Sequence, residues 1–176
     1  MFIEDAVSGK RAEVNSRQQV SARAISEPVL SRVSSKEGLS FIWTSQDLDI
    51  DAADTLLLVR NDSSNPLYID YIILSSGNVA TRYEIHVVTA SFTIAGTTVT
   101  GFCLNTALNK VAEATAASDE TGNTQGTVIY DVSLLATTTF ILPTTGLVLG
   151  TNISLGIDQV TESTAGNASI IGHYEP

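Results

Sequence analysis

The segment ADTLLLVRNDSSNPLYIDYIILSSGNVATRYEIHVVT, residues 53–89, decides the fold of this chain. It contains three apolar runs that are separated by turn-forming residues. In RYEIHVVT, the apolar residues Tyr83, Ile85 and Val87 alternate with polar ones, which is the period of a half-buried strand. Between the first two runs, NDSSNP combines Asn and Asp, which bond their own backbone, with a proline that cannot serve a central ladder. We therefore expect the first meander of an all-β sandwich here.

The other two runs of this segment differ in how many of their faces are apolar. In LYIDYIIL the odd-numbered positions are all apolar, and we expect them to share one face: Leu67, Ile69, Tyr71 and Ile73. In TLLLVR the consecutive residues 56–59 are all apolar, so both faces of that strand need cover. We expect the opposite sheet to cover one face, and an N-terminal arm or a neighbouring subunit to cover the other.

Length and charge limit the classes of function. A chain of 176 residues forms one domain, or one domain with an appendage. Residues 1–38 hold six basic and five acidic residues, a net charge of +1. Since the whole chain has a net charge of −10, residues 39–176 have a net charge of −11. A strongly acidic body is unsuited to binding nucleic acid or an anionic membrane. We expect neither as a partner.

Residues 1–38 differ in composition from the rest of the chain. They are polar and of mixed charge, and a segment of this kind does not fold alone. A brief helix near residues 5–19 is an alternative, although it has too few apolar positions to bury a face. We expect an extended N-terminal arm of residues 1–38, followed by a β-sandwich body of residues 39–176. No aromatic residue interleaves with the dispersed basic residues of the arm, as a nucleic-acid site would need, which favours protein contact. Its expected partner-binding residues are Arg11, Arg17, Arg23, Ile25, Val29, Leu30 and Arg32.

The body continues as short strands bounded by Gly, Pro and Asn. A strand at 39–45 comes first, and we expect a hairpin of residues 91–95 and 99–104 after the meander. Residues 105–126 lack the alternation typical of strands, and residues 112–117 could form a helical turn. In TVIYDVSLL, we expect Val128, Tyr130, Val132 and Leu134 to share one face. Further strands are expected at 138–142, 147–149, 152–157 and 168–174. The sum is an all-β, jelly-roll-like sandwich of about ten short strands.

The acidic series Asp47, Asp49, Asp51 and Asp54 is the sharpest local pattern. It resembles the start of a calcium loop, but Ala52 replaces the glycine of the sharp turn and Leu58 the bidentate glutamate. A solvated strand face is the preferred interpretation, and a weak cation site stays open.

Other reactive side chains are few. His86 has the sequence position of a cross-strand polar contact, and His173 adjoins an aromatic residue; neither has metal-ligand spacing to a second His or Cys. Cys103, the single cysteine, lies in an apolar run, which favours a core position. No nucleophile elbow, P-loop or dinucleotide fingerprint occurs. We therefore expect no enzyme, no catalytic residue, no metal and no cofactor.

The N-terminus MFIEDAVSGKRAE has no apolar core of the kind that signal peptides carry, and no apolar stretch is long enough to span a membrane. We expect a protein made in a cytoplasm. The glycosylation sequons at Asn61, Asn152 and Asn167 are then chance matches.

Two segments carry a family resemblance. RAISEPVLSRVSSKEGLSFIWTSQDLDIDAADTLLLVRNDSSNPLYIDYI, continued later by NKVAEATAASDETGNTQG, resembles small structural proteins of tailed-bacteriophage virions. In those proteins a polar N-terminal segment precedes a Thr-rich β-sandwich. The resemblance spans most of the chain, but it is to an architecture rather than to a motif, so no residue role is carried over.

The resemblance implies a non-enzymatic virion protein, a cement or decoration protein on the capsid surface that is assembled in the host cytoplasm. Such proteins are commonly homotrimers that sit over junctions between major capsid subunits and tie neighbours together with extended arms. A tail, neck or head-fibre protein is an alternative.

A glycan-binding jelly roll, acting through residues 105–126, is an alternative from another class. Sugar platforms need exposed aromatics, whereas most tyrosines here are expected in the core: Tyr68, Tyr71, Tyr83, Tyr130 and Tyr174.

Overall fold

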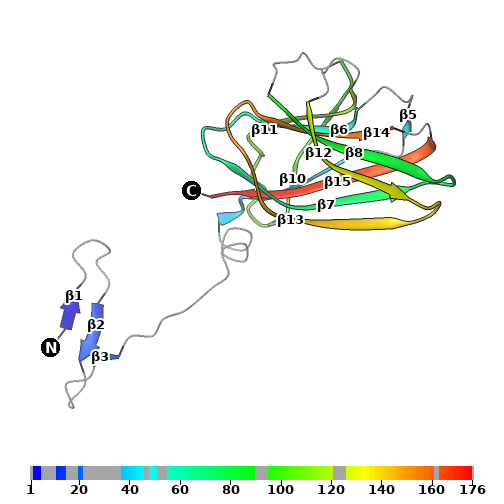
Figure 1. The fold of residues 1–176 in the computed structure, drawn as a ribbon. Helices are drawn as coiled ribbons and strands as arrows, with labels where there is room; N and C mark the ends of the chain where they lie inside the picture. The colour runs from blue at the N-terminus through cyan, green and yellow to red at the C-terminus, as the bar shows by residue number, and fades with distance from the viewer. Residues whose placement is uncertain are drawn as a thin grey trace.

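The computed structural model describes residues 2–4, 11–14, 20–21, 37–45, 48–50, 55–89, 95–120, 126–160 and 163–175. The regular structure within these ranges is almost entirely β-strand (Figure 1). None of the described residues forms a helix with the length and apolar character that crossing a membrane requires.

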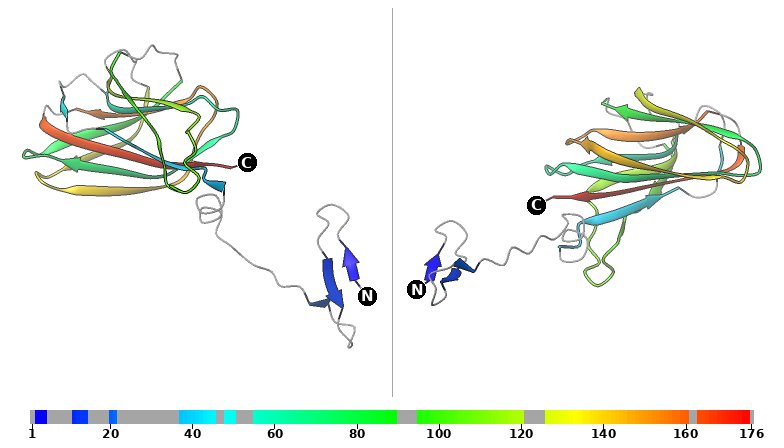
Figure 2. Two further views of the ribbon diagram at one scale, coloured as in Figure 1. Left: turned by 180° about the vertical axis from the view of Figure 1, so that it is seen from behind. Right: turned by 60° about the horizontal axis from the view of Figure 1, so that its bottom comes forward.

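The body is a sandwich of two antiparallel sheets, which Figures 1 and 2 show as two layers. The first, sheet I, has the order β10-β4-β15-β7-β13, and β5 also pairs with β15. Its strands are β4 (Ser40–Thr44), β5 (Leu48–Ile50), β7 (Leu67–Ser76), β10 (Phe102–Cys103), β13 (Thr139–Leu149) and β15 (Ser163–Tyr174). The second, sheet II, has the order β12-β8-β14-β6-β11-β9. Its strands are β6 (Thr55–Asn61), β8 (Thr81–Val88), β9 (Thr97–Val99), β11 (Ala114–Glu120), β12 (Thr127–Leu134) and β14 (Ser154–Gln159).

The strand pairing is that of a jelly roll. Strands of the first half pair antiparallel with strands of the second half in a nested series: β8 with β12, β7 with β13, β6 with β14, and β4 with β15. Rolling up this long hairpin adds the pairs β14–β8 and β15–β7, which complete the two sheets. The predicted all-β, jelly-roll-like sandwich is therefore confirmed.

The N-terminal residues also contain strands. β1 (Phe2–Glu4), β2 (Arg11–Val14) and β3 (Val20–Ser21) form an antiparallel sheet in the order β1-β2-β3. The alternative of a brief helix near residues 5–19 is wrong for 11–14, which are a strand. The division into an arm and a body at residue 38 stays a prediction.

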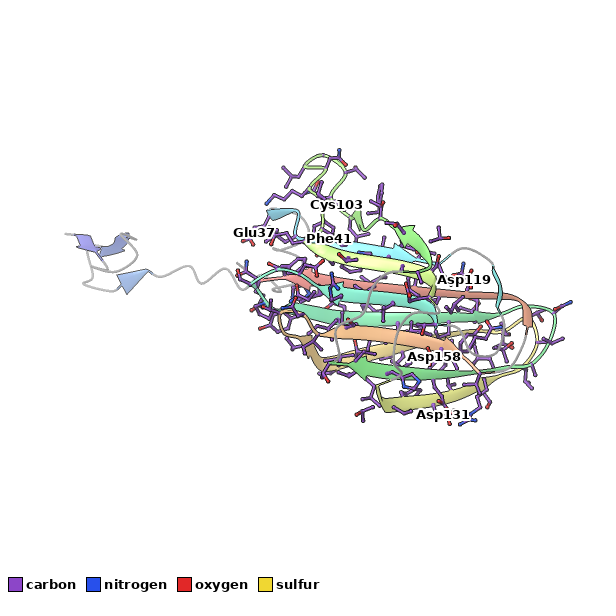
Figure 3. All side chains as sticks on the ribbon, turned by 90° about the horizontal axis from the view of Figure 1, so that it is seen from above. Glu37, Phe41, Cys103, Asp119, Asp131 and Asp158 are labelled. Carbon is purple, nitrogen blue, oxygen red and sulfur yellow. The ribbon has the colours of Figure 1, made fainter. Side chains whose placement is uncertain are left out.

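The core fills the space between the two sheets. Phe41 and Trp43 point inward from β4, and Phe41 makes an edge contact with Tyr174 at a centroid distance of 5.9 Å. Cys103 is buried in the same cluster, as predicted, and its Sγ lies 3.3 Å from the carbonyl oxygen of Gly38. Figure 3 labels Phe41 and Cys103 together at this side of the sandwich.

β6 is buried on both faces. Each of its residues Leu56, Leu57, Leu58 and Val59 is 0% exposed. The burial of both faces that TLLLVR predicts is thus confirmed. The expected cover by a neighbouring subunit is not required, because the single chain already buries both faces, and cover by the N-terminal arm stays a prediction. On the outer face, Leu58 lies beside Gly156 of β14, which has no side chain to displace it.

The prediction of a hairpin formed by residues 91–95 and 99–104 is wrong for the residues that the structure describes. Residues 91–94 lie outside the described ranges, and 99–104 divides between two sheets, because β9 pairs with β11 while β10 pairs with β4.

The prediction that residues 105–126 interrupt the series of strands is correct only in part. Residues 114–120 form β11, which lies between β6 and β9, and not a helical turn. Its sequence ATAASDE has high helix propensity at Ala, and pairing with the buried β6 overrides that local preference.

Candidate interaction face

The outer face of sheet II is charged and internally paired. Arg82 of β8 donates to Asp131 of β12 at 2.6 Å and to Glu84 at 2.7 Å. The hydrogen bonds from Arg82 hold the pKa of Asp131 below its ordinary value. Figure 3 labels Asp131 and Asp158 on neighbouring parts of this sheet.

A buried polar chain continues this pairing. His86 Nε2 lies 3.0 Å from Asp158 Oδ2 and 3.6 Å from Glu84 Oε2, and Thr55 Oγ1 donates to Asp158 Oδ1 at 2.7 Å. The cross-strand contact predicted for His86 is confirmed, although its side chain is buried and not solvated. The order Thr55–Asp158–His86 places the carboxylate, and not the imidazole, against the hydroxyl. This is not the arrangement in which a histidine removes a proton from a nucleophile.

Apart from β5, which contains Asp49, the strands of sheet I contain few charged residues. The strands β4, β7, β10, β13 and β15 contain one carboxylate, Asp70, one imidazole, His173, and no Lys or Arg. These two groups pair with each other, since His173 Nδ1 lies 2.9 Å from Asp70 Oδ2. These nearly uncharged strands contrast with the acidic composition of residues 39–176 as a whole.

The register of sheet I aligns apolar side chains in a row across its strands. From β10 across to β13, each residue of this row is the cross-strand partner of the next on the outer face: Phe102, Ile42, Ile171, Tyr71 and Pro143. Phe102 is 57% exposed and Tyr71 40%. A second row beside it consists of Thr44, Ser169, Ile73 and Ile141, and Ile141 is 56% exposed. We call these two rows the neutral face.

A hollow interrupts the neutral face where two bulges meet. In β13 the register shifts between Pro143 and Leu147, so that residues 144–146 bulge outward and Gly146 takes φ +84°. In β7 both Asp70 and Tyr71 lie outward between the buried Ile69 and Ile72. The bulges border an open hollow of about 310 Å³, which His173 and Tyr68 also line.

The β7 bulge corrects two predictions. Leu67 and Ile69 face the core, but Tyr71 and Ile73 lie on the outer face, so the odd positions do not share a face. Of the tyrosines expected in the core, Tyr71 lies outside it because of the bulge, and Tyr68 because it alternates with the inward-facing Leu67 and Ile69. Tyr130 is also exposed, whereas Tyr83 and Tyr174 lie in the core as predicted.

A similar correction applies to β12. A bulge between Val128 and Tyr130 moves Val128 opposite His86, away from the face that it was predicted to share with Tyr130.

The partner-binding residues predicted in the arm are not brought together by any described contact. Arg11 lies in β2, where its side chain is not described. The others lie outside the described residues: Arg17, Arg23, Ile25, Val29, Leu30 and Arg32. Their role stays a prediction.

Of the acidic series, Asp49 lies in β5, while Asp47, Asp51 and Asp54 fall outside the described ranges. Among the side chains that the structure describes, no group of three or more His, Cys, Asp or Glu is placed to hold a metal ion.

Sequence reasoning missed the neutral face. The signal was present, because the strand segments SFIWT, LYIDYIILSS, TFILPTTGLVL and STAGNASIIGHY are nearly free of charge. Its significance depends on knowing that these segments, distant in sequence, lie in one sheet. No family model, no curated protein and no solved structure matches this chain.

Proposed function

We propose that this protein is a non-enzymatic structural protein of a virion, a cement or decoration protein that stabilises a phage head by contacts with major capsid subunits. The neutral face is the observation that carries the proposal. Exposed apolar side chains that are contiguous, on an otherwise acidic body, mark a surface for another protein. The neutral face lies on five hydrogen-bonded strands of one sheet, so it is preorganised. Little conformational entropy is therefore lost when this face docks on a partner.

The fold adds support by analogy. Jelly rolls are common in viral capsid proteins and also in lectin domains, and the sequence resembles phage structural proteins. A fold alone does not define a function, so this support is secondary to the neutral face.

The mechanism is the addition of interface area. The neutral face docks on a capsid subunit, and the N-terminal segment, whose net charge of +1 differs from that of the acidic body, reaches a neighbouring subunit. Ordering such a segment costs conformational entropy, which the added backbone hydrogen bonds and small apolar contacts offset. A homotrimer placed over a junction of capsid subunits would present three copies of each contact.

The test uses heads that lack the protein and measures co-sedimentation of added protein. A chain that begins at Leu39 should fold and fail to bind. In the full chain, Ile141→Asp places a charge on the neutral face and should weaken binding at least about tenfold. The matched control is Val128→Asp, since Val128 is similarly exposed, at 47%, on the outer face of sheet II, and it should bind like the unaltered chain.

Undiminished binding by either the truncated chain or the Ile141→Asp variant would contradict the proposal. A reconstruction of the particle by electron microscopy separates a cement on the head from a tail, neck or head-fibre protein.

A further inference from the structure

We propose that the hollow between the β7 and β13 bulges is a binding site for a neutral saccharide. This inference rests on the hollow itself and goes beyond the proposed role in the virion; because Tyr71 and Pro143 belong both to the hollow and to the neutral face, a saccharide and a capsid subunit would compete for this part of the surface. A volume of about 310 Å³ lies at the lower end of the range of roughly 300–1,000 Å³ that is usual for ligand sites. The hollow therefore suits one or two sugar rings rather than a large cofactor.

The apolar lining of the hollow suits the C–H faces of a sugar ring. Tyr71 forms one side and is 40% exposed, so its ring is accessible to a ligand. Pro143 and Leu147 line the hollow from β13. Aromatic rings with a polar end pack against ligands that are apolar on one face and polar on their edge, which is the character of a pyranose.

The polar lining suits sugar hydroxyls. Asp70 Oδ2 is 2.9 Å from His173 Nδ1, and the ring of His173 stacks on Tyr68 with centroids 5.3 Å apart. These two contacts hold the imidazole in one orientation, with the Nδ1–H donating to the carboxylate. The remaining Asp70 oxygen, Oδ1, has no protein partner among the described residues, and it can accept a hydrogen bond from a hydroxyl.

The charge of the hollow favours a neutral ligand. Its lining includes one carboxylate paired with one imidazole and neither Lys nor Arg. An anionic sugar would meet the Asp70 carboxylate without a guanidinium or ammonium partner, on a body of net charge −11. Neutral hexoses and N-acetylhexosamines have no such penalty.

The backbone at the hollow allows a ligand to approach it closely. Residues 144–146 have no counterpart in β7, and Thr144 Oγ1 donates to the carbonyl oxygen of Ile69 at 2.6 Å, which fixes the bulge. A side chain at Gly146 would meet no heavy atom within 4 Å, so this position is open to a ligand. Bulges are over-represented next to active sites, where they re-aim side chains.

The experiment is a titration of the intact, isotope-labelled protein, followed by amide NMR. The probes are the methyl glycosides of glucose, galactose, mannose and N-acetylglucosamine, with sialic acid as the anionic comparison. At least one neutral glycoside should give saturable shifts at the amides of Tyr71 and Gly146, and sialic acid should give none.

Variants then assign the site. Tyr71→Ala and Asp70→Asn should each weaken binding of the responding glycoside at least about tenfold. Ile141→Ala, on the same sheet face but outside the hollow, should leave the affinity unchanged. The amide spectrum of each variant reports whether it is folded, and Asp70→Asn keeps the shape of the side chain if Tyr71→Ala does not fold.

Three results would overturn the site. They are the absence of saturable shifts at hollow amides with every neutral glycoside, shifts centred on residues 105–109 instead, or equal affinity in the unaltered chain and the Asp70→Asn variant. Capsid binding is scored separately by co-sedimentation, so a failure of either proposal leaves the other testable.

Discussion

Tyr83 shows how one hydroxyl joins the two sheets. Its ring is fully buried in β8 of sheet II, and its Oη donates to the carbonyl oxygen of Ser75 in β7 of sheet I at 2.7 Å. Burial raises the pKa of Tyr83 from 10.0 to about 12. Burial and the nearby carboxylates of Glu113 and Asp62 also raise the pKa of Tyr174.

The raised pKa of Tyr83 predicts alkaline destabilisation. Between pH 10 and about 12 the unfolded chain has lost this proton while the folded chain retains it, so the free energy of unfolding falls as pH rises. Urea unfolding measured across this interval should show a shallower pH dependence in Tyr83→Phe. At neutral pH the same variant should lose about 1 kcal/mol with the hydrogen bond to Ser75.

Tyr71→Phe is the control for Tyr83→Phe, because Tyr71 is an exposed tyrosine on the outer face. It should cost less stability at neutral pH. An identical pH profile for Tyr83→Phe and the unaltered chain would show that Tyr83 does not contribute to the alkaline transition.

At the scale of elements, the turn between β6 and β7 is organised by the buried side chain of Asn61. Its Nδ2 donates to the carbonyl oxygens of Asn65 and Leu149, both at 2.9 Å, and its Oδ1 accepts from the amide of Ser63 at 3.0 Å. Leu149 is the last residue of β13, so this side chain ties the turn to the opposite sheet. The turn cluster NDSSNP, predicted from the sequence, is confirmed with this additional long-range role.

Asn61→Ala should destabilise the body by about 2–3 kcal/mol, because it leaves a buried amide and a buried carbonyl without their partner. Chemical unfolding followed by circular dichroism measures the change. Ser64→Ala, an exposed position in the same turn, is the matched control and should change stability by less than about 0.5 kcal/mol. Equal losses in the two variants would mean that the turn is not held by the Asn61 side chain.

Bulges mark the limit of sequence reasoning at this scale. Alternation of apolar and polar residues placed β4, β6, β7, β8, β12 and β14 within a few residues of their observed bounds. It wrongly divided β13 into two strands, at 138–142 and 147–149, because the bulge of residues 144–146 reads as a turn in the sequence. It misassigned Tyr71, Ile73 and Val128, because an extra residue in one strand reverses every side chain beyond it. Whether a strand contains an extra residue depends on its partner, and the partner is not adjacent in sequence.

At the scale of the whole molecule, the nested pairing makes the C-terminal strand indispensable. β15 lies between β4 and β7 in sheet I and contributes Ala168, Ile170 and Tyr174 to the core. Nothing in the first half of the chain can replace it, since each of its partners needs it for one edge of its hydrogen-bond ladder.

We therefore expect a chain that ends at Val160 to lose cooperative thermal unfolding. A chain that begins at Leu39 should retain it, because β1, β2 and β3 pair only with one another in the part of the chain that the structure describes. Differential scanning calorimetry and amide NMR distinguish the two outcomes. Removal of Glu175 and Pro176 alone is the control. A cooperative transition in the chain that ends at Val160 would refute the indispensable role of β15.

The all-β class, the doubly buried β6, the turn at NDSSNP and the core position of Cys103 follow from the sequence alone. Each depends on local chemistry: side-chain period, apolar run length or turn-forming residues. The neutral face and its hollow were decided by the tertiary structure. They require five strands from distant parts of the chain to share one sheet in a particular register, with bulges in two of them. Register is a property of paired strands, and it is set when the nested hairpin rolls up rather than by any one segment.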